Sequence, residues 1–173
     1  MNRRSIPYLS SIALLLAIAQ SLSAQAHSVK NTKSEAALKE LASLAGKWGG
    51  VQDGVPIELT YTVTANGSAV MEEAKPSDGG SMITMFTADG DRLMATHYCA
   101  VGNQPQMAST MPGDFKNGVS FSLLRVTGMK TPGDWHNTGL TLTLDDNDHM
   151  TQRWTYAYKG KSGVNVFHYT RKK

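Results

Sequence analysis

Apolar and polar residues alternate along much of the chain after residue 56. In the segment 57–64, Ile, Leu, Tyr and Val occupy every second position, and Glu or Thr stand between them. The same period recurs at 140–144, where three leucines alternate with two threonines. Successive side chains of a strand point to opposite faces of a sheet, so this pattern predicts strands with one buried and one wet face.

Turn sequences divide this part of the chain into short strands. Asn66-Gly67, Asp89-Gly90 and Asn117-Gly118 are typical of hairpins. Two longer loops are predicted at 102–113 and 130–137, each containing proline and glycine. Strands joined by hairpins form a meander, and closing a meander removes its exposed edges. The pattern predicts an all-β fold, a single antiparallel up-and-down barrel of about eight to ten strands.

One short helix is predicted before the strands. Thr32 or Ser34 can cap its N-terminus, and Leu38, Leu41 and Leu44 then lie on one face. Gly46 is expected to end this helix in a left-handed conformation.

The first 26 residues have the three-part pattern of a secretory signal. A short basic start, with Arg3 and Arg4, precedes an apolar run at 12–19, and Ala24-Gln25-Ala26 offers small residues at the cleavage site. We therefore expect three segments: a signal peptide at 1–26, a tail and capping helix at 27–46, and a barrel domain at 47–173. This organisation predicts a periplasmic or secreted protein that has no membrane association after cleavage.

Charge narrows the range of partners. The whole chain carries +3, but Arg3 and Arg4 are the only charged residues before residue 27, so the remainder carries +1. Apart from the three basic residues at 171–173, no dense basic stripe remains. Proteins that bind nucleic acids usually carry a cluster of basic residues, and this sequence has none of that kind, so we expect no nucleic-acid partner.

The junction between helix and strands resembles that of a known superfamily. Gly46-Lys47-Trp48 follows the predicted helix, and Arg171 stands at the end of the last strand. This arrangement resembles the lipocalin-like (calycin) β-barrels. The stretch 93–107 is in addition similar to a pattern in uncharacterised exported bacterial proteins of that type. The resemblance implies that Trp48 packs across the closed end of the barrel and that Arg171 lies over its ring, a cation–π pair. Any ligand would then enter at the opposite end.

A more distant similarity concerns haem. Nitrobindin-type haem barrels begin with a comparable Gly-x-Trp strand and carry an iron-ligating His on the final strand. His168 stands at the corresponding place in this chain. The similarity implies haem as a possible cofactor, with His168 as the iron ligand.

Strand periodicity selects candidates for the barrel lumen. On the last strand, Val164, Val166 and His168 share a face, and if the valines face inward, His168 does too. His97 shares a face with Leu93 and Ala95 by the same rule. Of the pair Glu72-Glu73, at most one residue can point inward. The predicted lumen candidates for ligand contact are Tyr61, Met85, His97, Phe121, Trp154 and His168.

Three functions are compatible with these patterns. The favoured hypothesis is an exported binding protein that holds a small apolar or amphipathic molecule in the barrel lumen. The alternatives are a haem-binding barrel, and a structural or partner-binding protein whose barrel is filled. The sequence contains no Gly-x-Ser-x-Gly motif, phosphate-binding glycine loop or zinc-spaced His/Cys set, so no catalytic residue is assigned.

Overall fold

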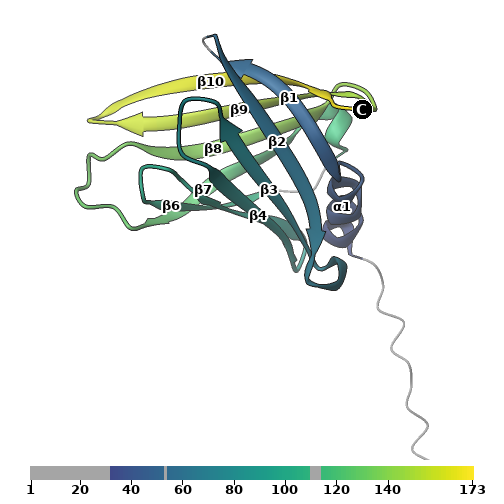
Figure 1. The fold of residues 1–173 in the computed structure, drawn as a ribbon. Coiled ribbons are helices and arrows are strands. Elements are labelled where there is room, and N and C mark those ends of the chain that lie inside the picture. The colour runs from purple at the N-terminus through teal and green to yellow at the C-terminus, as the bar shows by residue number, and fades with distance from the viewer. Residues whose placement is uncertain (1–31, 53, 110–113) are drawn as a thin grey trace, which may run out of the picture.

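The computed structural model describes residues 32–52, 54–109 and 114–173 and shows a closed antiparallel barrel with one preceding helix (Figure 1). The predicted signal peptide lies outside the described residues. The elements are α1 (Lys33–Ala42), β1 (Gly46–Gln52), β2 (Val55–Thr64), β3 (Ala69–Pro76), β4 (Met82–Asp89), β5 (Arg92–Tyr98), β6 (Gln104–Ser109), β7 (Val119–Thr127), β8 (His136–Leu144), β9 (His149–Tyr158) and β10 (Lys161–Arg171), with single turns of 3₁₀-helix at Ala65–Gly67 and Phe115–Asn117.

Each strand pairs with its neighbours in the chain, and β1 closes the barrel by pairing with both β2 and β10. Hairpins connect the strands in an up-and-down meander of ten strands, so the predicted fold class is confirmed. Closure pairs every described strand with a neighbour on both sides, which reduces the aggregation hazard of an open antiparallel sheet.

Helix α1 begins where its capping residues predict. Thr32 is the N-cap and forms a capping box with Glu35, each side chain bonding the backbone N–H of the other residue. The helix ends at Ala42, earlier than predicted, and Gly46 does not cap it. Gly46 is instead the first residue of β1, with a φ of 122° that glycine tolerates readily.

The apolar face of α1 covers one end of the barrel. Leu38, Leu41 and Leu44 are buried in the same core cluster as Trp48. The Trp48 indole N–H donates to the Leu44 carbonyl at 2.9 Å, which ties the start of β1 to the helix. In Figure 1 the C-terminus lies at this same end. Helix α1, with Leu38 and Leu41, and Leu44 just after it therefore form the closed end of the barrel.

Arg171 completes this end. Its guanidinium carbon lies 4.2 Å from the centroid of the Trp48 ring, and Trp48 pairs with Arg171 in the register of β1 and β10. The guanidinium also donates to the carbonyls of Ser43 and Ala45, at 3.2 and 3.1 Å. One side chain thus holds the last strand against both the first strand and the segment that follows the helix.

The main difference from the predicted elements is strand β6, which lies inside the predicted loop 102–113. It pairs with β5 over three positions only and has a register shift against β7 between Gln106 and Met107. Pro105 lies within the strand and can donate no backbone hydrogen bond. A short strand with a proline and an irregular register has little alternation, which explains why the sequence pattern indicated a loop.

Candidate functional site

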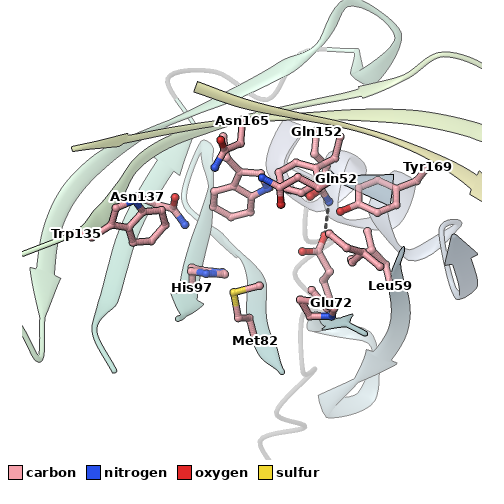
Figure 2. Close-up of a pocket in the computed structure, with 15 residues that line it drawn as sticks. Gln52, Leu59, Glu72, Met82, His97, Trp135, Asn137, Gln152, Asn165 and Tyr169 are labelled. Atoms are coloured by element: carbon pink, nitrogen blue, oxygen red, sulfur yellow. Dashed lines mark hydrogen bonds between the residues drawn. The ribbon is translucent and has the colours of Figure 1, made fainter. Parts of the chain in front are cut away.

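A cavity of about 210 Å³ lies inside the barrel (Figure 2). Its lining residues come from β1–β5, β8–β10 and the β7–β8 connection, and those at strand termini, such as Gln52, Pro76 and Met82, lie at the end opposite α1. The lining residues are Gln52, Ile57, Leu59, Glu72, Ala74, Pro76, Met82, His97, Trp135, Asn137, Gln152, Trp154, Asn165, Phe167 and Tyr169. The cavity therefore lies toward the end of the barrel opposite Trp48 and Arg171.

A row of polar side chains crosses the inner wall on four adjacent strands. Tyr61 on β2 is paired with Glu72 on β3, Glu72 with Thr84 on β4, and Thr84 with His97 on β5. All four residues are buried. Directly opposed residues on neighbouring strands have side chains within contact distance, so the register alone brings these groups together.

Hydrogen bonds join this row to β9 on the far wall. Gln152 donates through its amide nitrogen to Glu72 Oε2 at 2.5 Å and to the Tyr61 hydroxyl oxygen at 2.9 Å. The Tyr61 hydroxyl donates to the same carboxylate oxygen. The Trp154 indole N–H donates to Gln152 Oε1 at 2.9 Å. These bonds fix the orientation of the Gln152 amide and form a rigid polar floor.

Glu72 is the acidic group of this floor. Burial raises the pKa of Glu72 above its ordinary value, although hydrogen bonds from Tyr61, Gln152 and Thr84 work in the opposite direction. Burial and the neighbouring Glu72 carboxyl also raise the pKa of Tyr61 well above the usual tyrosine value, so Tyr61 stays protonated and acts as a donor. A carboxyl group that faces an apolar cavity can orient a polar group on a ligand.

Tyr169 closes the floor on the side of β1. Its ring needs a neighbour without a side chain, because a Cβ at Gly50 would come within 2.6 Å of a Tyr169 ring carbon. Burial raises the pKa of Tyr169. In Figure 2, Tyr169, Gln152 and Glu72 gather at one side of the cavity, and Trp135 and Asn137 lie at the other.

His97 forms part of the cavity wall. Its Nδ1 lies 2.9 Å from the Thr84 hydroxyl, and its ring packs against the Trp154 indole with centroids 4.9 Å apart. Burial lowers the pKa of His97 to about 4, so the imidazole is neutral near pH 7. Its Nε2 is shielded from solvent and has no hydrogen-bond partner among the described residues.

The mouth of the cavity is partly polar. Trp135 and Asn137 come from the β7–β8 side of the mouth, and Asn165 comes from β10. Asn103, in the β5–β6 turn, donates to the Trp135 carbonyl at 2.6 Å and holds this segment in place. An apolar cavity with polar groups at its floor and mouth is typical of a small-molecule site.

Four of the six predicted lumen candidates lie inside the barrel. His97 and Trp154 line the cavity, and Tyr61 belongs to the hydrogen-bonded floor. Phe121 is buried but packs against Phe86 in the core, with ring centroids 5.7 Å apart, and is not a lining residue.

The prediction that His168 faces the lumen is wrong. Val164 and Val166 are 44% and 46% exposed, so that face of β10 is the outer face and His168 is exposed with them. His168 Nδ1 lies 3.0 Å from the hydroxyl of Thr151 on the outside of the barrel. Exposed valines are common on the wet face of a sheet, since β-branched side chains fit extended backbone whether or not they are buried.

The placement of Met85 in the lumen is also wrong. Thr84 and Phe86 on β4 are buried and face inward, so Met85 lies on the outer face, paired with Thr96 and Met71. The inward methionine of this strand is Met82, which lines the cavity. Since β4 carries apolar residues on both faces, its periodicity alone does not distinguish them.

Haem does not fit these residues. The iron ligand that the distant similarity implied, His168, points away from the cavity. The cavity is also smaller than the roughly 300–1,000 Å³ of pockets that hold drug-sized ligands, and haem is larger than those ligands.

Several site residues were not among the sequence candidates, namely Glu72, Thr84, Gln152, Asn165, Phe167 and Tyr169. Gln152 has the same parity as Trp154 and Met150, so strand periodicity could have placed it inward. The sequence predicted that at most one residue of the Glu72-Glu73 pair points inward, and in the structure that residue is Glu72. The structure shows the register between strands, which places inward-facing residues such as Glu72 and Thr84 opposite one another, where they form hydrogen bonds.

Comparison with models of known protein families and with the curated proteins gave no match. Within residues 32–52, 54–109 and 114–173, no helix is long and apolar enough to cross a membrane. In the same part of the chain, no three or more His, Cys, Asp or Glu side chains are grouped to hold a metal ion. The geometry of the cavity therefore carries the functional interpretation.

The depressed pKa of His97 predicts a pH-dependent stability. The unfolded chain binds a proton at His97 below pH 6.5, whereas the folded chain does so only near pH 4. Stability from the neutral imidazole is therefore present above pH 6.5 and lost as the pH falls toward 4. Between these values, we expect the unfolding free energy of the wild type to fall by about 3 kcal/mol relative to His97→Leu.

Urea unfolding of both proteins at pH 4, 5, 6 and 7 measures this difference. The raised pKa of Glu72 has the opposite effect: it stabilises the folded state at low pH, and this stabilisation is lost as the pH rises. Because Glu72 is present in both proteins, the comparison with the variant removes its contribution. A constant difference across the range would show that His97 titrates alike in the folded and unfolded chains.

Proposed function

We propose that this protein is an exported binding protein that holds one small apolar or amphipathic molecule inside its barrel. The observation that carries the proposal is the cavity of about 210 Å³, with apolar walls and a hydrogen-bonded polar floor. A barrel whose only role is structural has no need of an internal space, because filling a cavity of this size stabilises a protein.

The volume indicates the size of the ligand. A dry apolar cavity of about 150 Å³ accepts benzene, so this cavity has room for one ring with one or two small substituents. The walls supply Leu59, Met82, Trp154 and Phe167 for contact with such a ring. A flexible thioether beside aromatic side chains adapts to ligands of slightly different shape.

The charge state of the lumen supports a neutral ligand. His97 is uncharged near pH 7, and Glu72 has all its described contacts to protein donors: Tyr61, Gln152 and Thr84. A charged ligand would have to lose its hydration without an opposite charge free to pair with it. An uncharged molecule with an apolar body meets no such cost.

Isothermal titration calorimetry with p-xylene tests this function. We expect saturable binding of one molecule per protein, with a negative heat-capacity change from burial of apolar surface. Heat that rises linearly without saturation would mean partitioning onto the surface and would contradict the proposal.

The export part of the proposal rests on the resemblance and on the first 26 residues. The cation–π contact between Trp48 and Arg171 supports the lipocalin-like resemblance, because the resemblance implied that pair. Expression of the whole chain in a Gram-negative bacterium is expected to yield a periplasmic or secreted protein that begins at His27. N-terminal sequencing and intact mass measure this, and a product that retains residues 1–26 in the membrane fraction would contradict export by cleavage.

A further inference from the structure

His97 carries a buried polar atom that no described residue of the protein satisfies. Nε2 has no hydrogen-bond partner among the described residues, and the His97 residue is 5% exposed. An unsatisfied buried polar atom costs about 1–3 kcal/mol, so such atoms are rare in folded proteins. One explanation for its persistence is that a ligand provides the missing partner.

The position of the atom supports this explanation. His97 points inward from β5, and its Nδ1 is held by Thr84 on the neighbouring strand. His97 lines the cavity, and Nε2 is the ring nitrogen that Thr84 does not contact. Figure 2 shows the His97 ring beside Met82 on the cavity wall. The Trp154 indole packs against the ring and restricts its rotation.

The hydrogen-bond network determines whether Nε2 donates or accepts. Glu72 Oε2 already receives hydrogen bonds from Tyr61 and Gln152. Among the described residues, Oε1 has one hydrogen-bond partner, the Thr84 hydroxyl at 3.5 Å. With Glu72 ionised, the Thr84 hydroxyl donates to Oε1, so the Thr84 oxygen accepts from the Nδ1–H of His97. A neutral imidazole has one N–H, so Nε2 is left with its lone pair and is an acceptor.

We propose that His97 Nε2 accepts a hydrogen bond from the ligand, so that the ligand is a ring-sized apolar molecule bearing a hydroxyl or N–H donor, such as a small phenol. This inference rests on the proposed binding function and adds the chemistry of the head group. Glu72 acts as a positioning residue, because it fixes the His97 tautomer through Thr84. The apolar walls select the body of the ligand and His97 selects its donor.

Two probes of equal size test the proposal. p-Cresol and p-xylene have the same number of heavy atoms and differ by a hydroxyl in place of one methyl group. The ratio of their Kd values (p-xylene over p-cresol) is measured by calorimetry in the wild type, His97→Leu and His168→Leu. Comparing ratios between proteins cancels the different hydration of the two probes.

We expect the ratio to fall by about tenfold in His97→Leu, which removes the acceptor at nearly constant volume. His168→Leu is the matched control, since His168 lies on the outer face, and its ratio should equal that of the wild type. An unchanged ratio in His97→Leu overturns the proposal. If neither probe binds saturably to the wild type, the binding function itself fails.

If His97→Leu no longer binds p-xylene, the ratio of the Kd values is measured in Thr84→Val instead. This isosteric change removes the link that fixes the His97 tautomer, so a lowered ratio with p-xylene binding retained supports the proposal. An unchanged ratio overturns it. ¹⁵N NMR of the wild type gives an independent reading: His97 Nε2 is expected to be unprotonated at pH 7, and a protonated Nε2 overturns the proposal.

Discussion

Ala74→Phe is expected to weaken p-xylene binding by at least about 100-fold. Ala74 lies on β3 with its side chain lining the cavity, between Leu59 and Met82 in the sheet register. A phenyl group at this position occupies the space that a ring-sized ligand needs, since a benzene ring fits a cavity of about 150 Å³. The substitution blocks binding by volume and leaves the polar floor in place.

The matched control is Ala157→Phe. Ala157 lies on β9 with the parity of Arg153 and Thr155, which face outward, so the added ring points away from the cavity. Its Kd for p-xylene should be within about twofold of the wild type, a difference of less than about 0.5 kcal/mol. Equal loss of binding in both variants, or none in Ala74→Phe, would place the ligand outside the cavity.

Trp48→Ala is expected to destabilise the fold by about 3–5 kcal/mol, the usual cost of truncating a fully buried aromatic side chain. Trp48 is 0% exposed and packs with the leucines of α1 at the closed end. Its removal also deletes the hydrogen bond to the Leu44 carbonyl and the cation–π contact with Arg171. Urea unfolding followed by circular dichroism measures the loss.

Trp135→Ala is the control for this variant. Trp135 is only partly buried at the mouth of the cavity, where it stacks on Tyr156 with ring centroids 5.6 Å apart. Its truncation should cost less than about 1 kcal/mol, because the site is open to solvent and leaves no sealed cavity. If the two variants were equally stable, Trp48 would not be the anchor of the closed end.

The sequence predicted the architecture because its strands and turns have strong local signals. Segment 57–64 alternates clearly, and Asn66-Gly67 turns β2 into β3, as the positive φ angles of 59° and 86° show. Strand β6 was missed, since its local pattern is weak and its pairing with β5 and β7 specifies it. Tertiary pairing decides such segments more than periodicity does.

The orientation of β10 could have been derived from the sequence. Arg171 was expected to cover Trp48 at the closed end, and Phe167 and Tyr169 have the same parity as Arg171. If Arg171 reaches over a core tryptophan, that parity faces inward and His168 must face outward. The expectation that Arg171 covers Trp48 was therefore incompatible with an inward His168. In the structure Arg171 covers Trp48 and His168 faces outward.

The polar floor was beyond what periodicity can predict. Each of Tyr61, Glu72, Thr84 and His97 has an inward parity, but only the register between strands places them opposite one another. A shift of one residue in any pairing would turn one of these side chains to the outer face. Gln152 joins the group from the opposite side of the barrel, a contact that no local pattern encodes.

A crystal structure of the protein grown with p-xylene tests the central claim most directly. The predicted result is one ring inside the barrel, in contact with Met82, Trp154 and Phe167, with the closed end at Trp48 unchanged. A ring bound only on the outer surface, or an interior filled by side chains with no room for it, would contradict the account.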